Sequence, residues 1–244
     1  MRVIGLDGRP GGLLLAGGLL LLLGGCSATT EAPLSSTRQS GFLGDYSRLQ
    51  PGDPKKGDAL LRWIDGTAQW RQYNKVMIDP VTYWSDEKSK LKPDDQEALV
   101  TYFRGALEKQ FAEVGFQVVD VSGPGVLRLQ VALTEADSST AGLRTVSLVV
   151  PQARLLNTVQ SLATGKYVGA GGAQAEFRLT DSVTGTILAE GLDKRFGGSS
   201  ASSAGSFEWG DAEIIMDTWA KEMASRLHAW TTGAAAPGDP APKK

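Results

Sequence analysis

The fold is decided by the stretch YVGAGGAQAEFRLTDSVTGTILAEGLDKRF, residues 167–196. It contains two runs of alternating apolar and polar residues, Tyr167–Thr180 and Thr186–Phe196. Such alternation is typical of β-strands with one buried face. The runs are separated by Asp181-Ser182-Val183-Thr184-Gly185, in which Asp, Ser and Gly are common turn residues. The stretch therefore predicts an antiparallel β-hairpin.

Three further stretches predict strands that extend this hairpin into a sheet. The alternation is clearest in Val126–Glu135, and shorter strands are expected at Ala59–Ile64 and Lys75–Trp84. In the last of these, one face would carry Val76 and Ile78 and the other Met77 and Val81. Pro80 cannot donate a backbone hydrogen bond, so it moves this strand to an edge or a bulge.

Two stretches show the apolar spacing of amphipathic helices. The first, Pro93–Val114, begins with Pro and a cluster of acidic residues and is followed by Gly115, which suits a helix C-terminus. The second is Glu208–Trp230. Two helices of this kind can cover one face of an antiparallel sheet, so we expect a single α+β domain. Short elements are also expected at 143–150 (extended) and 151–162 (helix).

The chain begins with a secretory signal. Arg2 and Arg9 precede the apolar run Leu13–Leu23, which is shorter than the roughly 20 residues of a spanning helix and ends in small residues before Cys26. We expect residues 1–25 to be removed, residues 26–40 to form a flexible tether, residues 41–232 to form the domain, and residues 233–244 to be a disordered tail.

Composition argues against several classes of protein. With 25 Lys and Arg against 27 Asp and Glu, the chain lacks the basic excess of nucleic-acid-binding proteins. It has one cysteine and one histidine, His228, so neither a disulfide within the chain nor a zinc site is expected. The glycines of 165–172 do not open a helix, so a backbone bulge is favoured over a phosphate-binding loop. No cofactor is expected.

Several motifs carry a resemblance to known proteins. Leu23-Gly24-Gly25-Cys26 resembles the lipobox of bacterial lipoproteins, which implies cleavage before Cys26 and a lipid on its sulfur; an ordinary signal peptide is the alternative. Ser27 resembles the outer-membrane sorting pattern. Residues 41–231 resemble a family of bacterial lipoproteins known only as a domain of unknown function. The motifs that carry this likeness are Gly41-Phe42-Leu43, Asp45-Tyr46-Ser47, Tyr73, Val76 to Val81 with Asp79, Glu176-Phe177, Asp181 to Gly185, Asp193, Arg195, Trp209, Asp211-Ala212 and Trp219-Ala220.

A looser resemblance concerns the hairpin alone. The strand-turn-strand Ala175–Ala189 is similar to hairpins of envelope assembly lipoproteins, such as the curli-secretion pore subunit and activators of penicillin-binding proteins, and to the N-terminal domain of the Tol translocation protein. Asp-x-x-Thr-Gly is a common turn sequence, so this likeness is an analogy of fold.

One candidate site follows from the register of the hairpin. If Thr180 pairs with Thr186, then Glu176 lies opposite Glu190, with Arg178 on the same face. Such a pair could bind a cation or shuttle a proton. Alternatively, the three residues form a solvated ladder, or the register is different, because like charges directly across a ladder are unfavourable.

Other candidate residues offer binding or purely structural roles. Trp84 beside Tyr83 is the best candidate among the tryptophans for a contact surface, against the alternative that it is buried. Asp79, Asp181 and Asp193 are candidates through the family motifs.

Together these observations predict a lipid-anchored envelope protein that binds or helps to assemble a partner and is not an enzyme. In a two-membrane bacterium it would lie at the outer membrane and face the periplasm. The alternative is an envelope hydrolase or lipid-modifying enzyme with a carboxylate site, but neither a nucleophile motif nor a metal motif supports it.

Overall fold

The computed structural model describes residues 29–84, 91–137, 171–197 and 209–242. Within these ranges nine strands form one sheet in the order β2-β3-β9-β8-β7-β4-β6, with β1 beside β9 and β5 beside β7. The strands are β1 (Thr29–Glu31), β2 (Gln50–Pro51), β3 (Leu61–Ile64), β4 (Lys75–Ile78), β5 (Thr82–Tyr83), β6 (Gln117–Val118), β7 (Val126–Asp137), β8 (Gly172–Asp181) and β9 (Ile187–Gly197).

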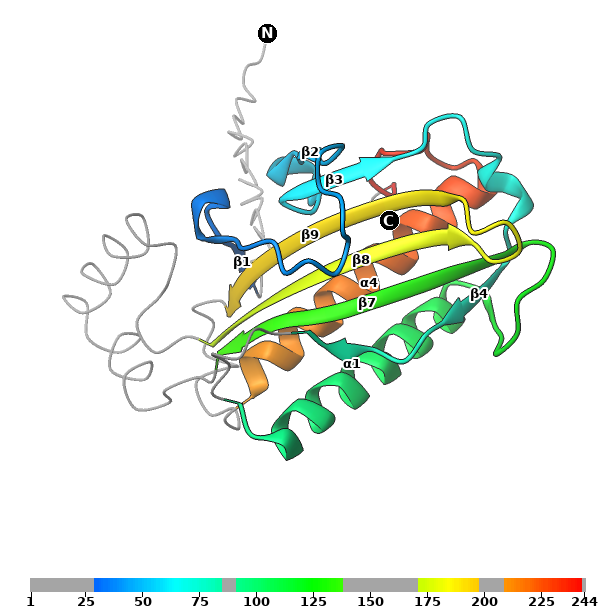
Figure 1. Ribbon diagram of the computed structural model, residues 1–244. Coiled ribbons are helices and arrows are strands. Elements are labelled where there is room, and N and C mark those ends of the chain that lie inside the picture. Colours follow the sequence, from blue (N-terminus) through cyan, green and yellow to red (C-terminus); the bar gives the residue numbers. More distant parts are fainter. Residues whose placement is uncertain (1–28, 85–90, 138–170, 198–208, 243–244) are drawn as a thin grey trace, which may run out of the picture.

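The helices among the described residues are α1 (Pro93–Glu113) and α4 (Gly210–Thr232), with short 3-10 turns at Leu34–Ser36, Pro54–Lys56 and Trp70–Gln72. Both long helices pack side by side on one face of the sheet, and the segment between β1 and β2 crosses the opposite face (Figure 1). This is the predicted α+β architecture in a single domain. The pairing is antiparallel from β2 to β7, whereas β4 and β5 run parallel to β7.

The core lies between the helices and the sheet. Phe103, Leu107 and Phe111 of α1 and Ile215 and Met216 of α4 have no exposed surface. They meet the alternate apolar residues of β7 and β8, which are Leu127, Leu129, Val131, Leu133, Ala173, Ala175, Phe177 and Leu179. Burial of each large side chain contributes about 1.5–3 kcal/mol, so this helix–sheet layer supplies most of the stability.

The predicted ends of the first long helix are confirmed within one residue. Gly115 follows α1 with a φ of 103°, in the left-handed region that favours glycine. The ring of Phe116 then packs edge-on against Phe111, with 5.4 Å between the ring centroids. This contact fixes the direction in which the chain leaves the helix and enters β6.

The strand predicted at Lys75–Trp84 is divided into two short strands, so Pro80 interrupts the strand as one of the two alternatives expected, but it does not place the strand at an edge. β4 is not an edge strand, because it pairs with β6 on one side and β7 on the other. The chain instead breaks at Asp79-Pro80, which separates β4 from β5. Because of this break Val81 is buried in the same core as Val76 and does not share the outer face with Met77.

The described parts of the two predicted flexible ends are also held in place. β1 pairs with the end of β9, and Gln174 and Glu176 accept hydrogen bonds from the backbone N–H groups of Arg38 and Ser40. At the other end, Trp230 Nε1 donates to the Asp239 carbonyl at 2.8 Å. The tether and tail were predicted from polar composition, but buried side chains satisfy their backbone groups. The expected elements at 143–150 and 151–162, and the glycines of 165–170, lie outside the described residues.

Candidate binding cavity and its ion pairs

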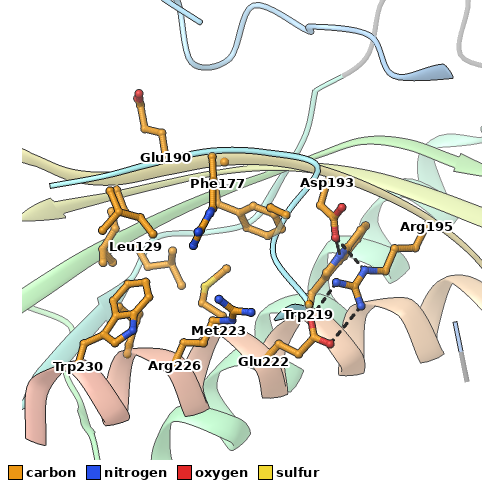
Figure 2. A pocket seen from close by; sticks show the side chains of 18 residues that line it. Leu129, Phe177, Glu190, Asp193, Arg195, Trp219, Glu222, Met223, Arg226 and Trp230 are labelled. Carbon is orange, nitrogen blue, oxygen red and sulfur yellow. Dashed lines mark hydrogen bonds and ion pairs between the residues drawn. The ribbon is translucent and has the colours of Figure 1, made fainter. Parts of the chain in front are cut away.

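A cavity of about 140 Å³ lies between α4 and the part of the sheet formed by β3, β9, β8 and β7. Its walls are mainly apolar, and Figure 2 shows Leu129, Phe177, Met223 and Trp230 around it. The sheet provides small residues here, Ala189 and Gly191 of β9, where larger side chains would fill the space against α4. The cavity therefore follows from the local sequence of the predicted hairpin.

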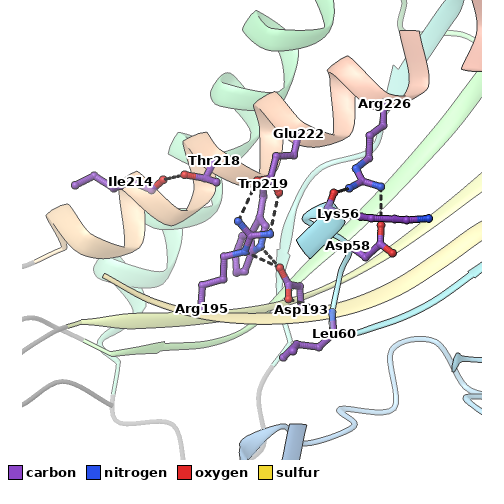
Figure 3. A network of polar contacts seen from close by, with 10 residues as sticks. All are labelled: Lys56, Asp58, Leu60, Asp193, Arg195, Ile214, Thr218, Trp219, Glu222 and Arg226. Carbon is purple, nitrogen blue, oxygen red and sulfur yellow. Dashed lines mark hydrogen bonds and ion pairs between the residues drawn. The ribbon is translucent and has the colours of Figure 1, made fainter. Parts of the chain in front are cut away.

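An ion-pair cluster borders one side of the cavity. Asp193, with only 1% of its surface exposed, accepts hydrogen bonds from Arg195 Nε at 2.8 Å and from Trp219 Nε1 at 2.7 Å. The backbone N–H of Leu60 also donates to it, at 3.2 Å. Arg195 continues to Glu222 of α4, with 2.8 Å between Nη2 and Oε2 (Figure 3). The cluster thus joins β9 to α4.

Asp193 and Glu222 stabilise the charged form of Arg195. Burial lowers the pKa of this guanidinium, but the charges of Asp193 and Glu222 more than offset the effect, so the pKa lies above its ordinary value. Removing either carboxylate would therefore leave the buried Arg195 cation with one carboxylate partner instead of two.

A second cluster lies next to the first, one turn further along α4, where Arg226 and Glu222 both approach Gly57. Asp58, 2% exposed, pairs with Arg226 of α4 at 2.8 Å and with Arg62 of β3 at 2.8 Å. Arg226 also donates to the Lys56 carbonyl, and Arg62 donates to the Gly238 carbonyl at 2.7 Å. The two clusters carry opposite net charges that cancel, so the mainly apolar wall of the cavity suits an uncharged apolar group.

The predicted pairing of Glu176 with Glu190 was wrong. A register irregularity between Leu179 and Thr180 places Arg178 opposite Glu190, and Glu176 lies opposite Leu192. Arg178 Nε donates to Glu190 at 2.7 Å. The irregularity removes the repulsion that two facing carboxylates would produce, and it replaces a like-charge pair with an ion pair.

Both glutamates bind the segment that crosses the outer face of the sheet. Glu176 has no exposed surface and accepts hydrogen bonds from the Tyr46 hydroxyl at 2.6 Å and from the Ser40 N–H at 2.9 Å. Glu190 also accepts a hydrogen bond from a second arginine, Arg48, with 2.7 Å between Arg48 Nε and Glu190 Oε2. The Gly41-Phe42-Leu43 and Asp45-Tyr46-Ser47 motifs therefore belong to a segment fixed on buried carboxylates.

The remaining predicted residues are spread over the domain. Asp79 forms a two-point hydrogen bond with Arg128 on the surface, at 2.8 Å and 3.0 Å. Trp84 is 46% exposed and packs edge-on against Phe42, with 5.7 Å between ring centroids. Of the predicted site residues, only Asp193 and the backbone of Glu190 reach the cavity.

Asp181 closes the hairpin turn. It accepts hydrogen bonds from the N–H groups of Val183 and Thr184 and from the Tyr73 hydroxyl at 2.9 Å. Burial raises the pKa of this carboxyl, but the hydrogen bonds more than offset the effect and place the pKa below its ordinary value. Its role is to fix the turn and the segment before β4.

The Tyr73–Asp181 hydrogen bond predicts a loss of stability in alkali. Burial and the Asp181 carboxylate raise the pKa of Tyr73 to about 12, whereas an unfolded tyrosine titrates near pH 10. Above pH 10 the unfolded state binds fewer protons than the folded state, so stability falls until the pH passes the folded pKa. Tyr73→Phe should show a smaller loss of unfolding free energy between pH 10 and 12, measured by urea denaturation. An unchanged slope would contradict the assignment.

Sequence reasoning missed most of the cavity. Asp58, Glu222 and Arg226 carry no motif, and the contacts Asp58–Arg226 and Glu222–Arg195 join residues that are far apart in the chain. The signal that could have found them is the pair Asp193 and Arg195 on the apolar face of a predicted strand, since buried charges require partners. Within the described ranges no three His, Cys, Asp or Glu side chains gather where they could hold a metal ion. Nor does any helix in those ranges combine the length and hydropathy needed to cross a bilayer.

Comparison with known proteins agrees with the resemblance seen in the motifs. Residues 38–223 match the model of a family described as "Protein of unknown function (DUF3313)". The chain is 29% identical over 148 residues to the Escherichia coli (strain K12) protein "Uncharacterized lipoprotein YdcL". That match covers 60% of this chain and 64% of the relative, so it spans less than two thirds of the relative's length.

Two solved structures are distantly similar. Protein XCC0632 from Xanthomonas campestris has a TM-score of 0.39 at 7% identity, with 67% of this chain and 92% of that chain covered. The PelC dodecamer from Paraburkholderia phytofirmans has a TM-score of 0.37 at 14% identity, with coverages of 66% and 94%. Similarity at this level supports no conclusion about fold or function.

The family match defines the class of protein: a single α+β domain of a family of unknown function, similar in sequence to a bacterial lipoprotein. Within that class, the chain belongs to the DUF3313 family.

Proposed function

We propose that the protein is a lipid-anchored accessory of the cell envelope that acts by binding and not by catalysis. The anchor is a lipid on Cys26, and in a two-membrane bacterium the domain faces the periplasm from the outer membrane. The lipobox-like Leu23-Gly24-Gly25-Cys26 and the following Ser27 support this placement. At about 0.8 kcal/mol per buried CH₂, two or more acyl chains hold such a domain stably at a membrane.

The observation that carries the binding role is the cavity. It is partly open to solvent, and its volume of about 140 Å³ is enough for a group the size of benzene, which engineered enclosed cavities of about 150 Å³ bind. Asp58 and Asp193, the buried carboxylates at its borders, already accept hydrogen bonds from arginines. These pairs make the walls electrically neutral, which favours an uncharged apolar occupant, such as a short alkyl or aromatic group. The proposal also includes a partner protein, which would bind at the exposed Trp84 and not at the cavity.

Filling the cavity tests this role. Benzene should raise the melting temperature of the wild-type protein with increasing concentration, because a ligand that binds only the folded state stabilises it by RT ln(1 + [L]/Kd). In Ala189→Leu the larger side chain occupies the space, and the benzene-dependent rise should disappear. Ala98→Leu, on the exposed face of α1, is the matched control and should keep the wild-type response. An equal response in all three proteins would contradict the cavity as a binding site.

The anchor is tested separately. Cys26→Ser should remove the protein from the membrane fraction and leave it in soluble or uncleaved pools. The mass of the wild-type product should exceed that of the cleaved chain by the attached acyl groups. If fractionation and mass are the same in both proteins, Cys26 carries no lipid.

A further inference from the structure

The chain enters the sheet directly after the proposed anchor. β1 begins at Thr29, three residues after Cys26, and its residues pair with the last three of β9. Thr29 lies opposite Gly197, and Glu31 lies opposite Arg195. β1 therefore begins at the end of β9 and runs toward the middle of the sheet.

Several other elements end or begin at the same place. Asp137, which ends β7, pairs with Gly172, which begins β8, and Gly172 pairs with Phe196 near the end of β9. The first turn of α4 is held here as well, because Asp211 accepts the N–H of Gly171 at 2.8 Å. We call this the anchor end of the domain. In Figure 1 it is the end from which both long helices start.

The reach of the connection is short. Three residues span at most about 11 Å when fully extended, so Thr29 stays within that distance of Cys26. The hairpin turn Asp181–Gly185 is at the other end of β8 and β9. Ten steps of about 3.4 Å along β9 separate the two ends by about 34 Å. The anchor end can therefore reach the bilayer surface. When the strands run away from the membrane, the turn lies about 34 Å further out and cannot reach that surface.

We propose that the anchor end faces the lipid bilayer surface and that the hairpin turn Asp181–Gly185 points away from it. The inference rests on the proposed lipid on Cys26. It replaces the expectation of a long flexible tether, because the pairing of β1 with β9 leaves only two residues, Ser27 and Ala28, between lipid and sheet. The domain then has a fixed orientation, with the turn presented to the periplasm.

Two exposed apolar residues provide matched probe positions. Leu34 is 44% exposed in the 3-10 turn after β1, where the neighbouring Ser36 carbonyl accepts Lys194 Nζ at 3.1 Å. It therefore lies near the anchor end. Val183 is 63% exposed in the hairpin turn. Because the chain has one cysteine and the lipid occupies its sulfur, a cysteine introduced at either position is the thiol available for labelling.

The experiment uses the full lipidated protein. Leu34→Cys and Val183→Cys are labelled with a fluorophore and reconstituted into vesicles of phosphatidylethanolamine and phosphatidylglycerol that carry head-group nitroxide lipids. The label at position 34 should be quenched several-fold more strongly than the label at position 183. Equal quenching, or stronger quenching at position 183, would overturn the proposed orientation.

A lengthened tether is the control. About fifteen Gly and Ser residues inserted between Ala28 and Thr29 add a flexible span of about 20 Å. The lengthened protein should still bind the vesicles but lose most of the difference between the two labels. A difference that survives the insertion would show that something other than the short connection orients the domain, and would contradict the inference. A protein that does not bind vesicles at all would instead contradict the lipid anchor itself.

Discussion

Asp193→Ala is expected to lower the free energy of unfolding by about 3–5 kcal/mol, the range measured when one partner of a buried ion pair is removed. Asp193 is almost fully buried and receives hydrogen bonds from Arg195, from the Trp219 indole and from the Leu60 backbone. The substitution leaves the indole N–H without its acceptor and leaves Arg195, itself 5% exposed, with Glu222 alone. Both losses fall in a site that water cannot easily enter.

Urea denaturation of the variant and the wild type measures this change. The matched control is Asp79→Ala, which removes an arginine–aspartate pair at a surface position and should cost about 0–1 kcal/mol. In Asp193→Ala/Arg195→Met the buried cation is gone as well, so the double variant should recover part of the loss. If Asp193→Ala costs no more than Asp79→Ala, the cluster is not what joins β9 to α4.

The elements that sequence predicted correctly are those with a strong period. Alternation over Val126–Glu135 and around the hairpin gave β7, β8 and β9, and the apolar stripes gave both long helices. Such elements can be predicted from the local sequence, because apolar residues recur every second position in a strand and about every 3.6 positions in a helix, and the two spacings are easily told apart. The break between β4 and β5 depends on how Val81 packs against residues distant in the chain, which no local pattern contains.

The cavity and the polar network were predicted only in part, for a similar reason. Asp193 could be named from the family motifs, and Glu176 and Glu190 from the assumed register of the hairpin. Their partners come from α4 and from the segment before β2, and the register of the hairpin depends on an irregularity at Leu179 and Thr180. A small shift in register changes which residues face each other, so the predicted carboxylate pair became an arginine–glutamate pair.

Glu190→Ala is expected to lower the free energy of unfolding by about 2–3 kcal/mol, the upper range for hydrogen bonds to charged groups. The Glu190 side chain is fully buried and binds both Arg178 and Arg48. Those arginines are partly exposed and can regain water, so the cost is smaller than for Asp193. Glu108→Ala, on an exposed helix pair with Arg104, is the control and should cost less than about 1 kcal/mol.

The same variant should also have a local effect that separates it from general destabilisation. Arg48 lies in the segment that crosses the outer face of the sheet, and Glu190 is its ion-pair partner on β9. Without Glu190, backbone amides of residues 38–49 should exchange with deuterium faster, while those of α1 change only as much as the global stability requires. Arg48→Ala should reproduce the local effect, because it breaks the same contact from the other side. Unchanged exchange over residues 38–49 in both variants would mean that the contacts of the segment with Gln174, Glu176 and Arg178 hold it without the Arg48–Glu190 pair.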